Sequence, residues 1–271
     1  MNESMLTISM RGKMEMFDSI STSCATNNNC QSRIQKVIDD IKNFSSEACE
    51  IIERYMLPSD DKNHITASKT VQMLTAIGCK VCICIFCYAD RQQKYQKGTR
   101  DKLTRNGEFL SVDRESDELP TINPVEIDGM KPFRYEAMGD LINSAHARNY
   151  IRMMYKNPDM NHSLFTKNPN LVWEAVKELG KPKNAVFVYS SSYVNVPEIE
   201  NYERYNKMCM EKFGYKLFDR LFTVWTANIA HRYAIEFNCC GANGMKDRKC
   251  KNCLNCYKRS GYNEFVNELL R

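Results

Sequence analysis

The sequence of 271 residues has no apolar run long enough to cross a membrane. Its longest such run, from Val81 to Ala89, falls far short of the ~20 residues that a membrane-spanning helix needs. The opening residues MNESMLTISMRGK lack the apolar core of a signal peptide. We therefore expect a cytoplasmic protein without a membrane partner.

The motifs of common nucleotide and hydrolase sites are also missing. The sequence has no P-loop, no GxGxxG and no GxSxG, which argues against nucleotide triphosphate hydrolysis and triad chemistry. None of its four histidines has helical ligand spacing to another, and only His231, shortly before the late cysteines, is a candidate ligand. The net charge of +5 is mild, so it permits nucleic-acid binding without requiring it.

Cysteine, by contrast, is abundant, with 13 residues. Disulfides rarely persist in a reducing compartment, so closely spaced thiols indicate metal or cluster ligands. The cysteines form three groups, which are Cys24 and Cys30, then Cys79, Cys82, Cys84 and Cys87, then Cys239, Cys240, Cys250, Cys253 and Cys256. Cys49 and Cys209 lie alone in helical patterns and are interpreted as buried small hydrophobes.

The middle group contains the motif Cys84-Ile85-Phe86-Cys87. This motif resembles the second half of the radical S-adenosylmethionine signature, in which three cysteines bind a [4Fe–4S] cluster and leave one iron for the cosubstrate. The resemblance implies Cys79, Cys84 and Cys87 as cofactor ligands, and Cys82 as a further metal ligand. Zinc or simply buried thiols remain the alternatives, and Cys24 and Cys30 remain open as ligands.

Two departures from that signature concern spacing. Four residues separate Cys79 from Cys84, whereas the signature has three at this place. No Gly-Gly-Glu follows the next strand, where Glu136 with Gly139-Asp140 is the nearest equivalent. S-adenosylmethionine is therefore a conditional expectation for this chain.

The late group places three cysteines at successive two-residue gaps, in Cys250-Lys-Asn-Cys253-Leu-Asn-Cys256. This spacing resembles ferredoxin-type [4Fe–4S] ligation, whereas structural zinc more often uses two separated Cys-x2-Cys pairs. Cys239 and Cys240 are candidates for the fourth ligand, and one of them is expected to be a spectator. Basic residues between 246 and 259 would balance a negatively charged centre or contact phosphates.

Strand and helix patterns alternate from Pro132 onward. Strands are predicted at 133–137, 163–166, 185–189 and 220–226, with helices at 141–154, 169–180 and 200–213, and a further strand at 81–86. Such alternation predicts parallel pairing. We expect an α/β fold, a partial, open βα barrel of about five to six parallel strands, in preference to a doubly wound sheet. One domain would span 1–237, with a helical insertion at about 32–77, and a Cys-rich segment at 238–271 would pack on it.

In either geometry the chemistry belongs at the carboxyl ends of the strands. Those ends carry Glu136, Asp140 and Lys167, which are the candidate catalytic residues, and the serines 190–192.

The order of these pieces resembles a phage family called gene product eighty-eight. The elements that carry the resemblance are a Ser-rich strand and Cys loop at Asp18–Cys30, Cys87-Tyr88-Ala89 before a basic helix with Asn106, Gly139-Asp140, Thr166-Lys167, Ser190-Ser191-Ser192 and Cys256-Tyr257. The family places its Cys loop close to Cys-Tyr-Ala, whereas a helical insertion separates them here. The resemblance supports the fold and a metal site but implies no reaction.

Two functions follow from these patterns. The first is an iron–sulfur protein of a phage or mobile element, a radical-S-adenosylmethionine-like enzyme with one or two [4Fe–4S] clusters. The second is a zinc-stabilised, replication-associated protein that binds nucleic acid without catalysis. Its contacts with phosphates would come from the basic segments 91–105 and 246–259.

Overall fold

A single parallel sheet forms the centre of the computed structural model, which describes residues 19–123, 126–127, 129–233, 253–258 and 263–270. Its six strands follow one another in chain order, from β1 (Ser19–Ile20), β2 (Pro132–Tyr135) and β3 (Asn161–Thr166) to β4 (Ala185–Ser190), β5 (Arg220–Trp225) and β6 (Phe265–Leu269). A doubly wound sheet must reverse its strand order at a switch point, and this sheet does not. The open α/β fold is confirmed, and the strand order is that of a partial barrel.

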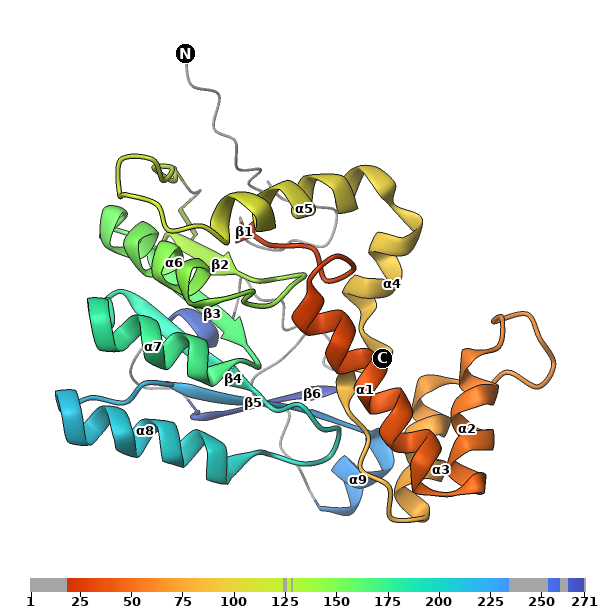
Figure 1. The fold of residues 1–271 in the computed structure, drawn as a ribbon. Coiled ribbons are helices and arrows are strands. Elements are labelled where there is room, and N and C mark those ends of the chain that lie inside the picture. The colour runs from red at the N-terminus through yellow and green to blue at the C-terminus, as the bar shows by residue number, and fades with distance from the viewer. Residues whose placement is uncertain (1–18, 124–125, 128, 234–252, 259–262, 271) are drawn as a thin grey trace.

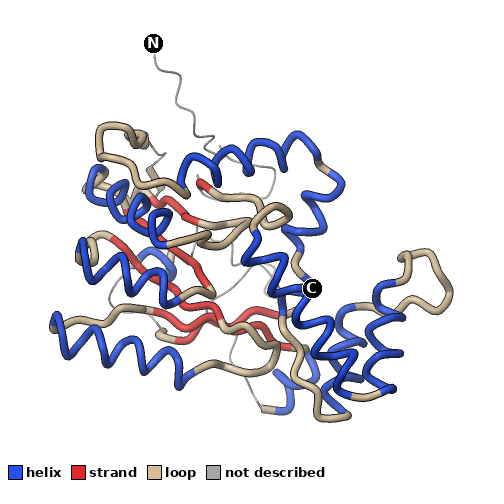
Figure 2. The backbone as a smooth tube through the Cα atoms, viewed as in Figure 1, coloured by secondary structure: helices blue, strands red, loops and turns tan. Residues whose placement is uncertain are grey.

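Three helices cover one face of the sheet, as Figures 1 and 2 show. They are α6 (Ser144–Lys156), α7 (Pro169–Leu179) and α8 (Ile199–Phe213), and each connects two successive strands. Alternate strand residues, including Phe133, Tyr135, Leu164 and Phe187, point toward these helices and are almost completely buried. This layer is the main hydrophobic core, and its elements match the predicted strands and helices closely.

The predicted insertion forms a helical lobe of α1 (Asn28–Phe44), α2 (Ser46–Met56) and α3 (Ala67–Ala76). Ser45 ends α1 and caps α2 by accepting a hydrogen bond from the Ala48 N–H, as expected for a short polar residue at a helix start. Ile52 and Leu74 are buried in a second apolar cluster that also includes Val194 after β4. The lobe lies beside the sheet near the end of α1 (Figure 1).

The strand predicted at 81–86 is wrong, because this segment forms the 3-10 helix η1 (Ile83–Phe86). It meets the sheet only through its first residues, where Cys82 bridges Tyr193 and the Ile83 N–H donates to the Ser192 carbonyl at 2.8 Å. The β-branched residues here bury against the lobe, so packing overrides their preference for a strand.

Three other segments differ from expectation. The basic helix expected after Cys87-Tyr88-Ala89 is two helices, α4 (Tyr88–Tyr95) and α5 (Lys97–Leu110). Strand β6 was not predicted, and it joins the late segment of the chain to the sheet beside β5. The short helix η3 (Asn255–Tyr257) of the same segment contacts β3 and β4. Among the described helices, none is long and apolar enough to cross a membrane.

Candidate functional site: thiols at the carboxyl edge of the sheet

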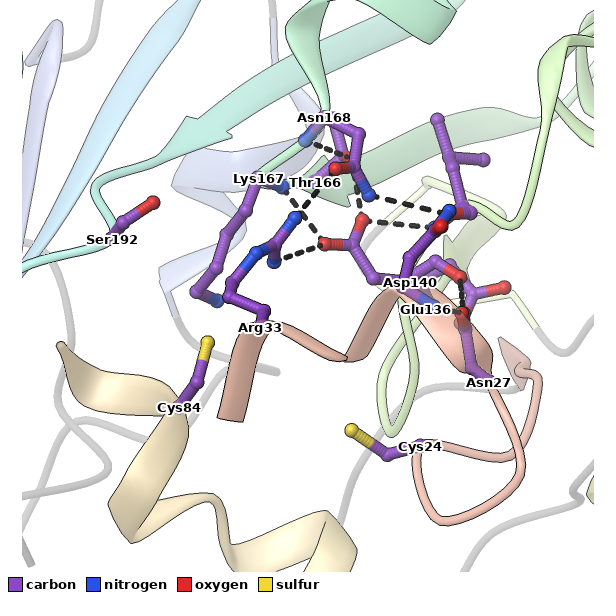
Figure 3. Close-up of polar contacts among 12 residues, drawn as sticks. Cys24, Asn27, Arg33, Cys84, Glu136, Asp140, Thr166, Lys167, Asn168 and Ser192 are labelled. Carbon is purple, nitrogen blue, oxygen red and sulfur yellow. Dashed lines mark hydrogen bonds and ion pairs between the residues drawn. The ribbon is translucent and has the colours of Figure 1, made fainter. Parts of the chain in front are cut away.

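The carboxyl ends of β1 to β4 meet at one edge because the strands are parallel and adjacent. Residues 21–24 follow β1, the segment from Glu136 to Asp140 follows β2, Lys167 follows β3, and Ser191-Ser192 follow β4. Figure 3 shows side chains from the segments after β1, β2 and β3 near one another, with Ser192 of the fourth segment standing apart from them.

Three thiols from distant segments converge at this edge, and we call Cys24, Cys30 and Cys87 the thiol triad. The Cys24 and Cys87 sulfurs are 3.8 Å apart, and the Cys30 thiol also interacts with that of Cys24. Cys30 lies in the first turn of α1, and Cys87 immediately precedes α4. Cys24 and Cys30 are each only 6% exposed, whereas Cys87 is half-buried.

The electrostatics of the triad favour one thiolate only. Hydrogen bonds with Cys30 and Cys87, together with burial, raise the pKa of Cys24 far above its usual range. The hydrogen bond from Cys24 lowers the pKa of Cys87, helped by the Asp90 backbone and by Lys167, although burial opposes this effect. A second thiolate would be repelled by the first, so three thiolates here require a compensating positive charge such as a metal supplies.

The triad does not form a closed site for a single ion. Two thiolates bound at ~2.3 Å to one tetrahedral ion are about 3.8 Å apart, which is the separation of Cys24 and Cys87. Among the described residues, however, no group of three or more His, Cys, Asp or Glu side chains is placed so that it could hold a metal ion.

Cys84 approaches the triad from η1 and faces two cations. Figure 3 shows the Lys167 side chain running from the end of β3 toward Cys84, with Arg33 of α1 beside it. The hydrogen bond from Cys82, followed by the charges of Lys167 and Arg33, lowers the pKa of Cys84 to about 6 against the effect of burial. The same contact with Cys84, with burial, raises the pKa of Cys82. Cys84 is therefore the most readily ionised of these thiols.

The nearby thiols and Asp140 in turn raise the pKa values of Lys167 and Arg33. Burial opposes the charge of Lys167, but the negative charges of Cys84, Asp140 and Cys87 outweigh it and raise the pKa of the ammonium group. Burial also opposes the charge of Arg33, and Asp140 and Cys84 again outweigh it. Both side chains thus stay charged beside the thiols.

Asp140 fixes the geometry of this edge. Its carboxylate accepts hydrogen bonds from the Thr166 hydroxyl at 2.5 Å, the Lys167 N–H at 3.2 Å and Arg33 at 3.4 Å. Its carbonyl accepts from the Asn27 amide at 2.9 Å. One residue therefore ties together the segments that follow β1, β2 and β3.

The Glu136 side chain is fully buried in the loop that follows β2. Its carboxylate accepts from the Thr22 N–H at 3.2 Å, the Thr22 hydroxyl at 3.1 Å and the Tyr150 hydroxyl at 2.5 Å. His146 accepts at Nδ1 from a backbone N–H, so its Nε2 carries a proton 3.3 Å from the carboxylate. Because these partners belong to the protein and the side chain is fully buried, Glu136 positions the loop and does not face a substrate.

The other predicted ligands lie elsewhere. Cys79 is buried in the core of the helical lobe, where burial raises its pKa. Cys253 lies two residues before η3 and Cys256 lies within it. Cys256 packs against Leu254 and Tyr257, as do Ile127 and Met130, which precede β2. The described late cysteines are thus near the amino ends of the strands, opposite the triad. Cys239, Cys240 and Cys250 fall outside the described residues, and His231 is exposed on α9 (Ala227–Arg232).

Sequence reasoning left Cys24 and Cys30 undecided and preferred Cys79. The usable signal was the family pattern, in which the Cys loop after the first strand lies close to Cys-Tyr-Ala. Without the insertion at about 32–77, only about ten residues would separate Cys30 from Cys87, and the fold brings the two together in space.

The fold and the site define an open α/β protein with a thiol-rich centre at the carboxyl edge of its parallel sheet. The chain matches the family described as Gene product 88 over residues 16–259, and it belongs to this family. The match includes the thiol triad, Asp140 and Lys167, and it confirms the resemblance found in the sequence. Comparisons with curated proteins and with solved structures gave no match.

Proposed function

We propose that this protein is an iron–sulfur enzyme, similar to the radical S-adenosylmethionine class, with a [4Fe–4S] cluster on Cys24, Cys30 and Cys87. The observation that carries the proposal is the convergence of three thiols from segments that lie far apart in the sequence. The interaction of Cys24 with both partners, 3.8 Å from the Cys87 sulfur, makes them one donor set. Three ligands leave one iron of such a cluster open, as in the signature that Cys84-Ile-Phe-Cys87 resembles.

The resemblance of Cys84-Ile-Phe-Cys87 to the radical S-adenosylmethionine signature favours a cluster over zinc. Structural zinc is held by four ligands around one point, and no such group is found among the described residues. The 3.8 Å between the Cys24 and Cys87 sulfurs is the spacing of two ligands on one metal atom, so ligation of separate irons requires these two thiols to move apart. Thiolate-bound clusters carry net negative charge, which Lys167 and Arg33 would balance.

The chain's own residues would have distinct roles. Such a cluster supplies one-electron chemistry at its open iron when it is bound. Lys167 faces the thiols from the end of β3 and is the candidate catalytic residue, whereas Asp140 and Glu136 position the loops around it. The burial of Cys24 and Cys30 limits access of water, which radical chemistry requires.

Metal analysis of anaerobically purified protein tests this proposal. We expect brown protein with about four irons and four sulfides per cluster. Cys24→Ala, Cys30→Ala and Cys87→Ala should each lose most of the iron and the visible absorption. Cys49→Ala, on the lobe, and Cys79→Ala, in its core, should keep both.

The contrary results are equally clear. Colourless protein with stoichiometric zinc would support the zinc-stabilised alternative. Protein with neither metal, or iron that survives loss of the whole triad and disappears with Cys253→Ala and Cys256→Ala, would overturn the assignment of the triad.

A further inference from the structure

The positive charge of the chain is concentrated in one short segment. Residues 91–105 contain six of the 38 basic residues and one of the 33 acidic ones, so the rest of the chain holds 32 of each. The net charge of +5 therefore belongs entirely to this segment. A charge distribution of this kind is a local attraction for a polyanion.

The segment folds into the corner between α4 and α5, which Figure 1 shows projecting above α1. We call the exposed side chains Arg91, Tyr95, Lys97, Lys102 and Arg105 the basic corner. Arg91 and Tyr95 are four residues apart on α4, and Lys102 and Arg105 are three apart on α5, so each pair shares a helix face.

Tyr95 is the feature that identifies the partner. Its side chain is 88% exposed, more than any other described large hydrophobic residue. The apolar residues Leu103 and Leu110 of α5 are buried, and Leu110 belongs to the main hydrophobic core. The corner thus offers one aromatic ring among cations and no continuous apolar face of the kind that inserts into a membrane.

Few acidic side chains adjoin the corner: Asp101 lies four residues from both Lys97 and Arg105, and exposed Glu108 lies three residues from Arg105. Asp101 is half-buried, and its carboxylate lies 3.8 Å from Arg100, which is not part of the corner. Asp90 is buried and accepts a hydrogen bond from Gln31 at 2.9 Å.

We propose that the basic corner binds single-stranded nucleic acid, with a base stacked on Tyr95 and phosphates on the surrounding cations. An exposed aromatic ring within a positively charged surface is the combination that single strands use, because every base can stack and every phosphate is an anion. A duplex hides its bases, so Tyr95 would contribute little to binding it.

The position of the corner gives this binding a function, which rests on the iron–sulfur proposal above. Helix α4 starts directly after Cys87, and Tyr95 lies eight residues further, about 12 Å along the helix. A strand held at Tyr95 would reach the triad within a few nucleotides. The substrate class of the enzyme is therefore a single-stranded nucleic acid.

Fluorescence anisotropy with labelled 15-mers of dT and of rU, and with a 15-base-pair duplex, tests the proposal on the full chain. We expect saturable binding of at least one single strand at 50 mM NaCl, weakening as salt rises. Tyr95→Ala should weaken binding about tenfold or more, since stacking contributes ~1–3 kcal/mol per base. Tyr95→Phe should restore it, and Tyr233→Ala, at another exposed tyrosine, should leave it unchanged.

A matched pair of charge variants separates a site from general attraction. Lys97→Gln, Lys102→Gln and Arg105→Gln together should reduce the slope of log affinity against log salt by about 2, because each phosphate bound by a single-strand site contributes ~0.7 to that slope. Lys62→Gln, Lys69→Gln and Lys80→Gln change the net charge equally at exposed positions on the lobe and its connection, and should not change the slope. Equal loss in both triple variants, no effect of Tyr95→Ala, or no binding of either single strand would overturn the proposal.

Binding and the cluster can fail separately. Protein carrying Cys24→Ala and Cys87→Ala should still bind the oligonucleotide, because the corner does not need the metal. Brown protein that binds none of the single-stranded oligonucleotides would refute the proposal for the basic corner and leave the cluster proposal unaffected.

Discussion

Substituting Gly139 with alanine should strongly destabilise the protein, although it adds only one methyl group. A Cβ atom there would lie 2.4 Å from a Glu136 carboxylate oxygen, 2.5 Å from the Thr22 carbonyl and 2.6 Å from the Thr22 hydroxyl. Contacts below 3.0 Å are essentially never seen for a Cβ, and one of these is with backbone, which cannot rotate away. The Gly139→Ala protein must therefore separate the loop after β2 from the segment after β1.

The magnitude follows from what that separation breaks. Glu136 accepts two hydrogen bonds from Thr22, and hydrogen bonds to a charged group contribute ~1.5–3 kcal/mol each. Losing most of them, with the strain of overpacking, should lower the free energy of unfolding by about 3–5 kcal/mol. That is a large share of the ~5–15 kcal/mol of a typical domain. If the triad holds a cluster as proposed, iron content should fall as well, because the loop also carries Asp140.

Urea unfolding followed by circular dichroism measures this change, and Gly98→Ala is the matched control. Gly98 lies within α5 with no atom near the added methyl group, so alanine there should stabilise the protein by about 0.5–1 kcal/mol through helix propensity. If Gly139→Ala unfolds within 1 kcal/mol of the wild type, the loop packing described for Glu136 is incorrect.

Three further changes test the scaffold. Burial lowers the pKa of His162 to about 4, so between pH 6.5 and pH 4 the unfolded chain binds a proton at this histidine and the folded chain does not. The free energy of unfolding should therefore fall by up to about 3 kcal/mol as the pH drops from 6.5 to 4, and His162→Gln should flatten that profile. Lys181→Met leaves the Asp219 carboxylate, 2.7 Å from the ammonium group, without its buried cation and should cost about 3–5 kcal/mol in urea titrations; a loss below 1 kcal/mol would contradict the burial of the pair. Thr166→Val removes the 2.5 Å hydrogen bond to Asp140 and should cost about 1.5–3 kcal/mol and reduce iron retention; unchanged iron would mean that Asp140 does not position the site.

The sequence predicted the part of the fold that packs in regular layers. Strands such as 185–189 are continuous apolar runs because both faces of a parallel strand are covered, and the Asn168-Pro169 and Gly180 signals bound α7 through local backbone preferences. Strand β1 has two residues, too few for any period, and β6 is an edge strand in which only Val266 is buried. The segment 81–86 has the composition of a strand, but its partners are the lobe and the loop after β4, which no local pattern records.

The sequence predicted that the site would be rich in thiols, but it did not predict which cysteines form it. The excess of closely spaced cysteines pointed to a thiol centre, and Asp140 and Lys167 were placed at the correct edge because strand ends of a parallel sheet coincide. Spacing along the chain then favoured Cys79 as the partner of Cys84 and Cys87. The structure turns Cys79 into the lobe, since α3 ends just before it, and brings Cys24 to Cys87 instead.

The reason lies in how the helical lobe interrupts the Cys loop. The chain leaves the carboxyl edge along α1 after Cys30 and returns to it through residues 81–83, which pair with residues 192–194 after β4. This pairing, and not the sequence distance, sets where Cys84 and Cys87 lie. Arg33 on the outgoing helix bonds Asp140 and Asn168, so both ends of the lobe are attached to the strand ends. A large insertion can therefore enter a cysteine loop without separating its thiols, because the sheet edge holds both of its attachment points.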